Sequence, residues 1–152
     1  MTNVYVASDH AGFELKKIIL DEMKGAEGYE FLDLGTESKE SCDYPIFAQR
    51  VVKRLKMYDD SLGVLICGTG IGMSIAANRY EWIRAALCFN EKMAEMSRRH
   101  NDANVIVFGA KIISPEEALK SLKRFLSEDF EGETRHLRRL NMINQLTYGE
   151  DE

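Results

Sequence analysis

The sequence has little cysteine, which can crosslink a small domain, and little proline, which breaks helices and strands. It contains three cysteines and two prolines among 152 residues. Cys42, Cys67 and Cys88 are widely spaced, with no CxxC pair and no Cys/His spacing typical of a metal site. We therefore expect reduced thiols in a cytoplasmic protein that needs no structural metal.

Long apolar segments and a basic surplus are also missing. The sequence has no apolar run of about 18 residues, the length that spans a membrane. It enters a strand-like segment at Asn3–Ser8 without the basic and apolar regions of a signal peptide, so we expect a protein that is neither exported nor bound to membranes. The formal net charge of −5 argues against nucleic acid as a partner. An anionic ligand must then bind at a local basic patch.

The composition fits one domain over residues 1–152, because 45% hydrophobic residues in a chain of this size supply a real core. Apolar runs of strand length alternate with segments of helical period, which predicts an α/β fold: a three-layer, doubly wound (Rossmann-like) sheet of about five parallel strands, with a C-terminal helix. The predicted strands are Val4–Ala7, Glu30–Leu34, Leu62–Cys67, Arg84–Cys88 and Asn104–Phe108. The predicted helices are Phe13–Met23, Pro45–Tyr58, Gly72–Asn78, Glu91–Ser97, Pro115–Leu126 and His136–Leu146. Ser114-Pro-Glu-Glu117 predicts a capping box.

An apolar strand runs directly into a glycine-rich turn with one thiol, Cys67, at the bend. Gly68, Gly70 and Gly72 remove the Cβ atoms that would screen backbone N–H groups, so the loop is suited to hold an anion. The start of the following helix is an electropositive setting for a reactive thiol. Free cysteines are also often buried in the core without any chemical role. The loop alone therefore leaves open whether Cys67 is a reactive thiol or a core residue.

Two familiar phosphate-binding motifs do not fit this loop. The dinucleotide fingerprint needs a third glycine where Met73 stands, and the loop follows the third predicted strand rather than the first. A P-loop needs Gly-Lys-Ser/Thr, but no lysine lies between Lys56 and Lys92.

Polar residues follow several predicted elements: Ser8-Asp-His-Ala-Gly12, Cys67-Gly-Thr-Gly70 and Ser97-Arg-Arg-His-Asn-Asp102. Because doubly wound sheets bind ligands outside the carboxyl ends of their strands, we expect these segments to meet in one crevice. Asp9 is equally suited to be a helix N-cap, and Thr69 to satisfy its own turn. Isolated histidines are more often surface residues than catalytic ones.

A basic run follows an acidic connector near the C-terminus. The connector, residues 127–133, is interpreted as a solvated loop. Arg135 and Arg139 are four residues apart and share a helix face, which predicts a two-arginine clamp. His136, within the same run, is expected on a solvated basic face.

These motifs, taken together, resemble the B-type ribose-5-phosphate isomerases, a family that also contains the galactose-6-phosphate isomerase subunits. The resemblance covers nearly the whole chain in the right order. It rests on Ser8-Asp-His-Ala-Gly12, Asp33-Leu-Gly-Thr36, Asp43-Tyr-Pro45, Ile66-Cys-Gly-Thr-Gly-Ile-Gly-Met-Ser-Ile-Ala-Ala-Asn78, Arg99-His-Asn-Asp102 and Arg135-His-Leu-Arg-Arg139.

The resemblance implies an aldose-ketose isomerase that interconverts ribose 5-phosphate and ribulose 5-phosphate through an enediolate, without metal or cofactor. Cys67 is the implied base, Thr69 moves protons on the sugar oxygens, and His100 opens the sugar ring with support from Asp9. The implied substrate-binding residues are His10, Arg135 and Arg139 for the phosphate, Asn101 for a sugar oxygen, Tyr44 and Lys111 in the pocket, and the loop residues Gly68, Gly70, Ile71, Gly72, Met73 and Ser74. The family places its site between subunits, which implies a homodimer or a dimer of dimers.

Three positions depart from the family's pattern. One branch replaces the cysteine by a glutamate four residues later, but here that position is Ile71, so Cys67 has no local substitute. Glu133-Thr134 stands where relatives have a shorter Gly-Arg junction, and this affects the placement of Arg135. Lys111 stands where many relatives have arginine, and lysine lacks the bidentate fork.

Other functions stay open at this level. A galactose or allose 6-phosphate is the alternative substrate, since the sequence does not reveal pocket length. A non-catalytic module that binds sugar phosphates is the alternative class. A redox role for Cys67 would need a second thiol, and Cys88 is the residue that could approach it through the fold.

Overall fold

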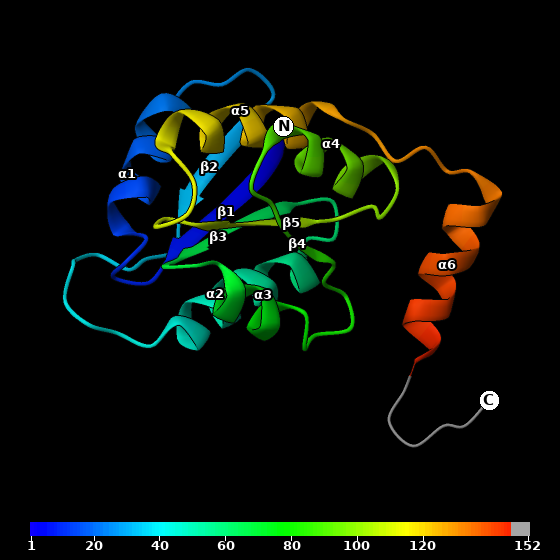
Figure 1. The fold of residues 1–152 in the computed structure, drawn as a ribbon, viewed down its shortest axis with the longest axis horizontal. Coiled ribbons are helices and arrows are strands. Elements are labelled where there is room, and N and C mark those ends of the chain that lie inside the picture. The colour runs from blue at the N-terminus through cyan, green and yellow to red at the C-terminus, as the bar shows by residue number, and fades with distance from the viewer. Residues whose placement is uncertain (147–152) are drawn as a thin grey trace.

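The computed structural model describes residues 1–146 and contains one sheet of five parallel strands (Figure 1). The strands are β1 (Thr2–Ser8), β2 (Tyr29–Asp33), β3 (Leu62–Cys67), β4 (Ala85–Leu87) and β5 (Val105–Gly109). They lie in the order β2-β1-β3-β5-β4. All five strands lie where the sequence predicts them, although β4 has only three residues.

The direction of strand order reverses between β1 and β3. β1 pairs with β2 on one side and with β3 on the other. Beyond β3 the sheet continues through β5 to the edge strand β4, which the chain forms before it returns to β5. Such a reversal is the switch point at which open α/β sheets bind their ligands. Ser8 of β1 pairs with Ile66 of β3, so the ends of these two strands are adjacent.

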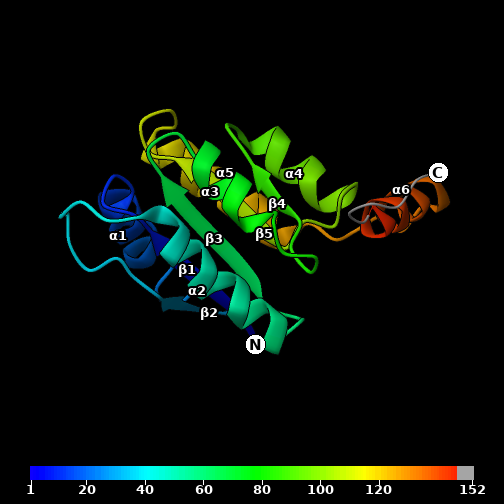
Figure 2. The ribbon, with the colours of Figure 1, turned by 90° about the horizontal axis from the view of Figure 1, so that it is seen from below.

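Helices cover both faces of the sheet and complete the predicted three layers (Figures 1 and 2). One face carries α1 (Phe13–Glu22), α4 (Glu91–Arg99) and α5 (Pro115–Ser127), and the other carries α2 (Tyr44–Met57) and α3 (Ile71–Ala77). The C-terminal helix α6 (Thr134–Gln145) stands apart from these layers, beyond the end of the sheet opposite the segment that links β2 to α2.

The predicted capping box is only half formed. Ser114 Oγ accepts the backbone N–H of Glu117 at 3.1 Å, and Pro115 occupies the first helical position of α5. The carboxylate of Glu117 does not return to Ser114, however, but accepts the N–H of Glu91 at 3.0 Å. Glu117 thereby ties the start of α5 to the start of α4.

The core consists of two clusters, one on each face of the sheet. Successive strand residues face opposite ways, so Val64 and Ile66 join the cluster under α1 and α5, whereas Leu65 and Cys67 join the cluster under α2 and α3. Cys88 belongs to the first cluster, and burial raises the pKa of its thiol to about 11. The sheet therefore separates Cys67 from Cys88, which argues against a redox pair between them. All three cysteines are free thiols.

A buried lysine fixes the segment that follows β2. Lys16, on α1, is 1% exposed, and its Nζ donates to Asp33 Oδ1 and to the carbonyl of Thr36, both at 2.6 Å. This segment continues to Cys42 and to the start of α2 at Tyr44, so Lys16 anchors a part of the chain that borders the switch point. Within residues 1–146, no helix has the length and apolar character needed to cross a membrane.

Candidate active site

The loop after β1 lies directly against the end of β3. The backbone N–H of Asp9 donates to the carbonyl of Ile66 at 3.1 Å, and a Cβ at Gly12 would lie 2.6 Å from Ile66 Cγ2. Asp9 Oδ1 accepts the N–H of Gly12 at 3.1 Å. Asp9 thus caps the turn that precedes α1, whose own N-cap residue is Gly12. Asp9 is therefore not the N-cap residue of α1, although its side chain holds the turn before it. Asp9 is 6% exposed and lies at the switch point.

Cys67 is the last residue of β3, and the glycine loop turns the chain from it into α3. Gly70 begins this helix with φ of +79°, a left-handed conformation that favours glycine. Thr69 Oγ1 accepts the N–H of Ile71 at 3.3 Å, as expected if Thr69 satisfies its own turn. Ser74 N–H donates to the carbonyl of Gly70 at 3.0 Å. Cys67 is 5% exposed, so its thiol lies at the base of the loop.

The glycine loop packs tightly on the end of β5. A Cβ at Gly109 would lie 2.4 Å from the carbonyl carbon and oxygen of Thr69. The carbonyl of Gly68 accepts the N–H of Lys111 at 2.9 Å, and that of Cys67 accepts the N–H of Ala110 at 2.9 Å. The Lys111 side chain also lies over Gly68, with its Cδ and Cε 3.6 Å from the position of a Cβ there. Lys111 is therefore positioned at the glycine loop.

Two aromatic side chains complete this part of the site. Tyr44, at the start of α2, lies against Gly72, where a Cβ would be 2.6 Å from its Cζ. His10 Nδ1 accepts the N–H of Cys42 at 3.2 Å, so in the neutral ring the proton is on Nε2. The Sγ atom of Cys42 lies 3.8 Å from the same nitrogen. The sequence analysis did not predict Cys42 as a site residue, although it directly precedes the motif Asp43-Tyr-Pro45, which could have indicated its position.

We call these residues the carboxyl-edge group, because they all lie at the carboxyl ends of β1, β3 and β5. Its members are Asp9, His10, Tyr44, Lys111 and the loop residues Cys67, Gly68, Thr69, Gly70, Ile71, Gly72, Met73 and Ser74.

The other predicted site residues do not join this group within one chain. α4 crosses back from the carboxyl end of β4 to the amino end of β5, so His100 and Asn101 lie at the amino edge of the sheet. Asn104, just before β5, accepts the N–H of Gly63 at the start of β3. The expectation that residues 97–102 meet Cys67 in one crevice is therefore wrong for a single chain. Asn101 instead lines a hollow of about 420 Å³ with Leu140 and Ile143 of α6.

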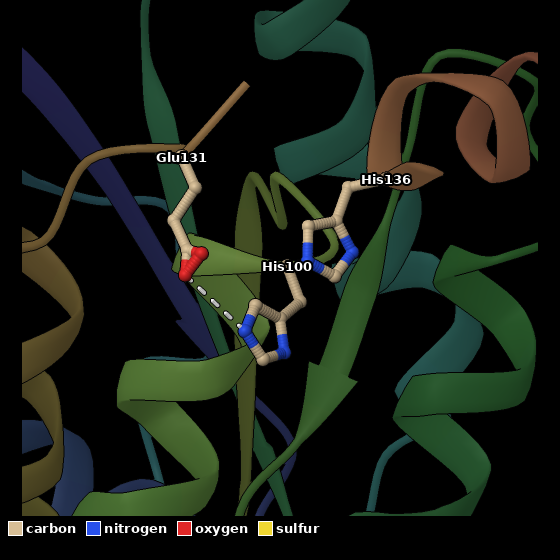
Figure 3. Close-up of side chains that lie close together, drawn as sticks. All are labelled: His100, Glu131 and His136. Carbon is tan, nitrogen blue, oxygen red and sulfur yellow. Dashed lines mark ion pairs between the residues drawn. The ribbon is translucent and has the colours of Figure 1, made fainter. Parts of the chain in front are cut away.

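The amino-edge group consists of His100, Asn101, Glu131, Arg135, His136 and Arg139. His100 and His136 stack with their ring centroids 4.3 Å apart and an interplanar angle of 14°. Glu131 Oε1 lies 3.4 Å from His100 Nε2 and accepts a hydrogen bond from Arg99 Nη2 at 3.0 Å (Figure 3). Arg135 and Arg139 are exposed, and Arg135 forms an ion pair with Glu133, the N-cap residue of α6.

His136 was expected on a solvated face, but it is 7% exposed. Burial lowers the pKa of His136, and the positive charge of Arg135 lowers it further. The lowered pKa favours the uncharged form of the ring. Its burial arises from the stack on His100, a contact between distant segments that helical spacing does not reveal.

His100, Glu131 and His136 offer three possible metal ligands within 4.8 Å of one another. Zinc binds an imidazole nitrogen along its lone pair, in the plane of the ring. Two stacked rings cannot both direct such a lone pair to one ion between them. The arrangement is suited to holding an imidazole rather than to holding a metal.

Comparisons with known proteins agree with this geometry. The ribose 5-phosphate isomerase of Thermotoga maritima is 46% identical and superposes with a TM-score of 0.91 over 95% of this chain and 99% of that one. Ribose-5-phosphate isomerase B of Mycoplasma genitalium, solved with bound ribulose-5-phosphate, is 40% identical with a TM-score of 0.89, covering 95% of each chain. The Escherichia coli (strain K12) ribose-5-phosphate isomerase B is 38% identical over 146 residues, 96% of this chain and 97% of that protein.

These relatives identify the chain as an isomerase whose doubly wound sheet has a thiol and a glycine loop at its switch point. The profile of the Ribose/Galactose Isomerase family matches residues 4–143, and the chain belongs to this family.

We predict that Gly109→Ala displaces the glycine loop, because the new Cβ would overlap the backbone of Thr69. Amide hydrogen exchange of residues 69–74 should accelerate about tenfold. Gly63→Ala is the matched control, because its Cβ would meet a Val51 side chain at 2.7 Å at the opposite end of β3. Equal exchange rates for the loop in the two variants would contradict the role given to Gly109.

Proposed function

We propose that this protein interconverts ribose 5-phosphate and ribulose 5-phosphate through an enediolate, with Cys67 as the base. The observation that carries the proposal is the position of Cys67, at the end of β3, beside the switch point and at the base of the glycine loop. The bound ribulose-5-phosphate of the Mycoplasma genitalium relative supports a pentose phosphate as substrate.

The reaction moves one proton between neighbouring carbons. The Cys67 thiolate takes the proton from C2 of the open-chain aldose and returns it at C1, while negative charge develops on the enediolate oxygens. Backbone N–H groups stabilise such charge when they already point at it. Ile71 N–H is engaged by Thr69 Oγ1 and Ser74 N–H by Gly70. The N–H groups of Gly70, Gly72 and Met73 are thus the donors that we assign to the enediolate.

Thr69 is assigned the transfer of protons between O1 and O2. Its Oγ accepts a hydrogen bond from Ile71, which leaves the hydroxyl proton available for a substrate oxygen. Ile71 stands at the position of the glutamate used by one branch of the family, and its apolar side chain has no proton to exchange. Cys67 is therefore the base that we assign to the loop.

The phosphate and the sugar ring need the amino-edge group as well. His10, Arg135 and Arg139 are assigned to the phosphate, Asn101 to a sugar oxygen, and His100, with Asp9, to opening of the furanose ring. Arginine presents a planar fork that matches a phosphate, whereas the net charge of −5 repels one. Lys111 adds a cation at the loop without the fork.

A homodimer reconciles the separation of the two groups. In a two-fold dimer, the carboxyl-edge group of one chain can face the amino-edge group of the other, and each pairing occurs twice. Exposed apolar side chains support such an interface: Ile71 and Ile75 on α3, and Leu137, Met142 and Ile143 on α6. Apolar residues on two surface helices mark surfaces that another chain covers. Assembly into a dimer of dimers, and the cytoplasmic location expected from the thiols, stay predictions.

We predict that Cys67→Ala lowers kcat for ribose 5-phosphate by about a thousandfold, because the reaction loses its base. The circular dichroism spectrum should not change. Cys88→Ala is the control, since Cys88 lies on the other face of the sheet. Full turnover by Cys67→Ala would show that another group is the base. Turnover of a six-carbon phosphate in preference to ribose 5-phosphate would favour the alternative substrate, and binding without turnover would favour a non-catalytic module.

We further predict that two inactive variants regain activity when they form mixed dimers with each other. Cys67→Ala and His100→Asn lose different halves of a shared site, so a mixed dimer contains one intact site and one that lacks both residues. Mixing equal amounts after reversible dissociation should restore about a quarter of the wild-type activity. Recovery of no activity in dimers shown to be mixed would indicate a site built within one chain.

A further inference from the structure

His100 is held on two sides by residues to which the reaction scheme assigns no role. Glu131 approaches the edge of its ring at Nε2, and His136 covers one face of it (Figure 3). His100 ends α4 as its C-cap residue, and its side chain keeps 34% exposure. The ring is therefore oriented by its neighbours while part of it stays accessible.

Glu131 is itself fixed to the end of α4 by two contacts with one residue. Its backbone N–H donates to the carbonyl of Arg99 at 3.0 Å, and its Oε1 accepts from Arg99 Nη2 at 3.0 Å. Arg99 also donates to Glu95 Oε1 at 2.9 Å, one turn earlier on α4. The carboxylate that faces His100 Nε2 thus belongs to a chain of charged contacts that holds it in place.

His136 contacts His100 through the face of its ring. Its ring lies nearly parallel to that of His100, and burial lowers the pKa of His136. The uncharged form that this favours can pack against His100 without placing a positive charge next to it. The Nε2 atom of His136 is buried without a hydrogen-bond partner among residues 1–146, whereas the ring itself stacks on His100.

We propose that Glu131 and His136 are positioning residues that hold His100 in the tautomer with its proton on Nε2, so that Nδ1 is the nitrogen that meets the sugar. The partner of one imidazole nitrogen decides which nitrogen carries the proton, and a carboxylate facing Nε2 selects Nε2–H. This inference rests on the ring-opening role proposed for His100.

The assignment gives ring opening a balanced proton path. The furanose opens when the O1–H and C1–O4 bonds break and the C1=O1 and O4–H bonds form. O1 and O4 are both bonded to C1, so one nitrogen can serve both. The neutral Nδ1 accepts the proton from O1 and returns it to O4, while Nε2 keeps its own proton toward Glu131.

The test compares Glu131→Leu, which removes the acceptor, with Glu128→Leu as a matched control. Glu128 lies on the same connector but pairs with Arg124. The ¹⁵N shifts of the His100 ring, identified by their absence in His100→Asn, should report the Nε2–H tautomer in the wild type and in Glu128→Leu, and a mixture in Glu131→Leu. The kcat for ribose 5-phosphate should fall about tenfold in Glu131→Leu, with KM within about twofold.

A kinetic isotope effect separates positioning from a general loss of structure. If ring opening becomes slow in Glu131→Leu, the effect of deuterium at C2 on kcat should shrink toward one. His136→Phe, which keeps a flat ring, should retain more activity than His136→Leu. The same tautomer and kcat in both glutamate variants would overturn the inference. Wild-type turnover by His100→Asn would instead overturn the ring-opening role in the proposed function, and this inference with it.

Discussion

The close contact between the glycine loop and the end of β5 is the constraint on which the site depends. It exists because Gly109 has no Cβ, which would otherwise lie 2.4 Å from the Thr69 carbonyl. The contact brings the carbonyls of Cys67 and Gly68 to the N–H groups of Ala110 and Lys111. A parallel sheet covered on both faces thereby presents a thiol, a loop of backbone donors and a lysine at one point of its edge.

The sheet also separates two kinds of chemistry within each chain. The carboxyl edge has the thiol and the backbone donors that suit proton transfer at carbon. The amino edge has two stacked imidazoles and two arginines, which suit ring opening and phosphate binding together with Asp9 and His10 of the carboxyl edge. Its helix α6 stands away from the layers (Figure 1). Two-fold association would let each chain contribute its carboxyl edge to one site and its amino edge to the other. The arginines of the amino edge would then supply positive charge at each site, although each chain has a net charge of −5.

The positions of the strands and most of the carboxyl-edge group could be predicted, because local signals in the sequence indicate them. β3 is a continuous apolar run, and the glycines after Cys67 mark the close turn. The amino-edge group could not be assembled in this way. The run from Ser97 to Asp102 includes the last turn of the crossover helix α4, which ends at the amino edge of the sheet, whereas β4 before it ends at the carboxyl edge. The stack of His136 on His100, and the contact of Cys42 with His10, join segments far apart in sequence, so neither periodicity nor spacing contained them.

The central claim is that this chain isomerises a pentose phosphate with its own thiol as the base. The most direct measurement is turnover of ribose 5-phosphate by the purified protein in excess chelator, with ketose formation followed directly. The account predicts turnover at the same rate with and without chelator. A folded protein that forms no ribulose 5-phosphate would contradict it.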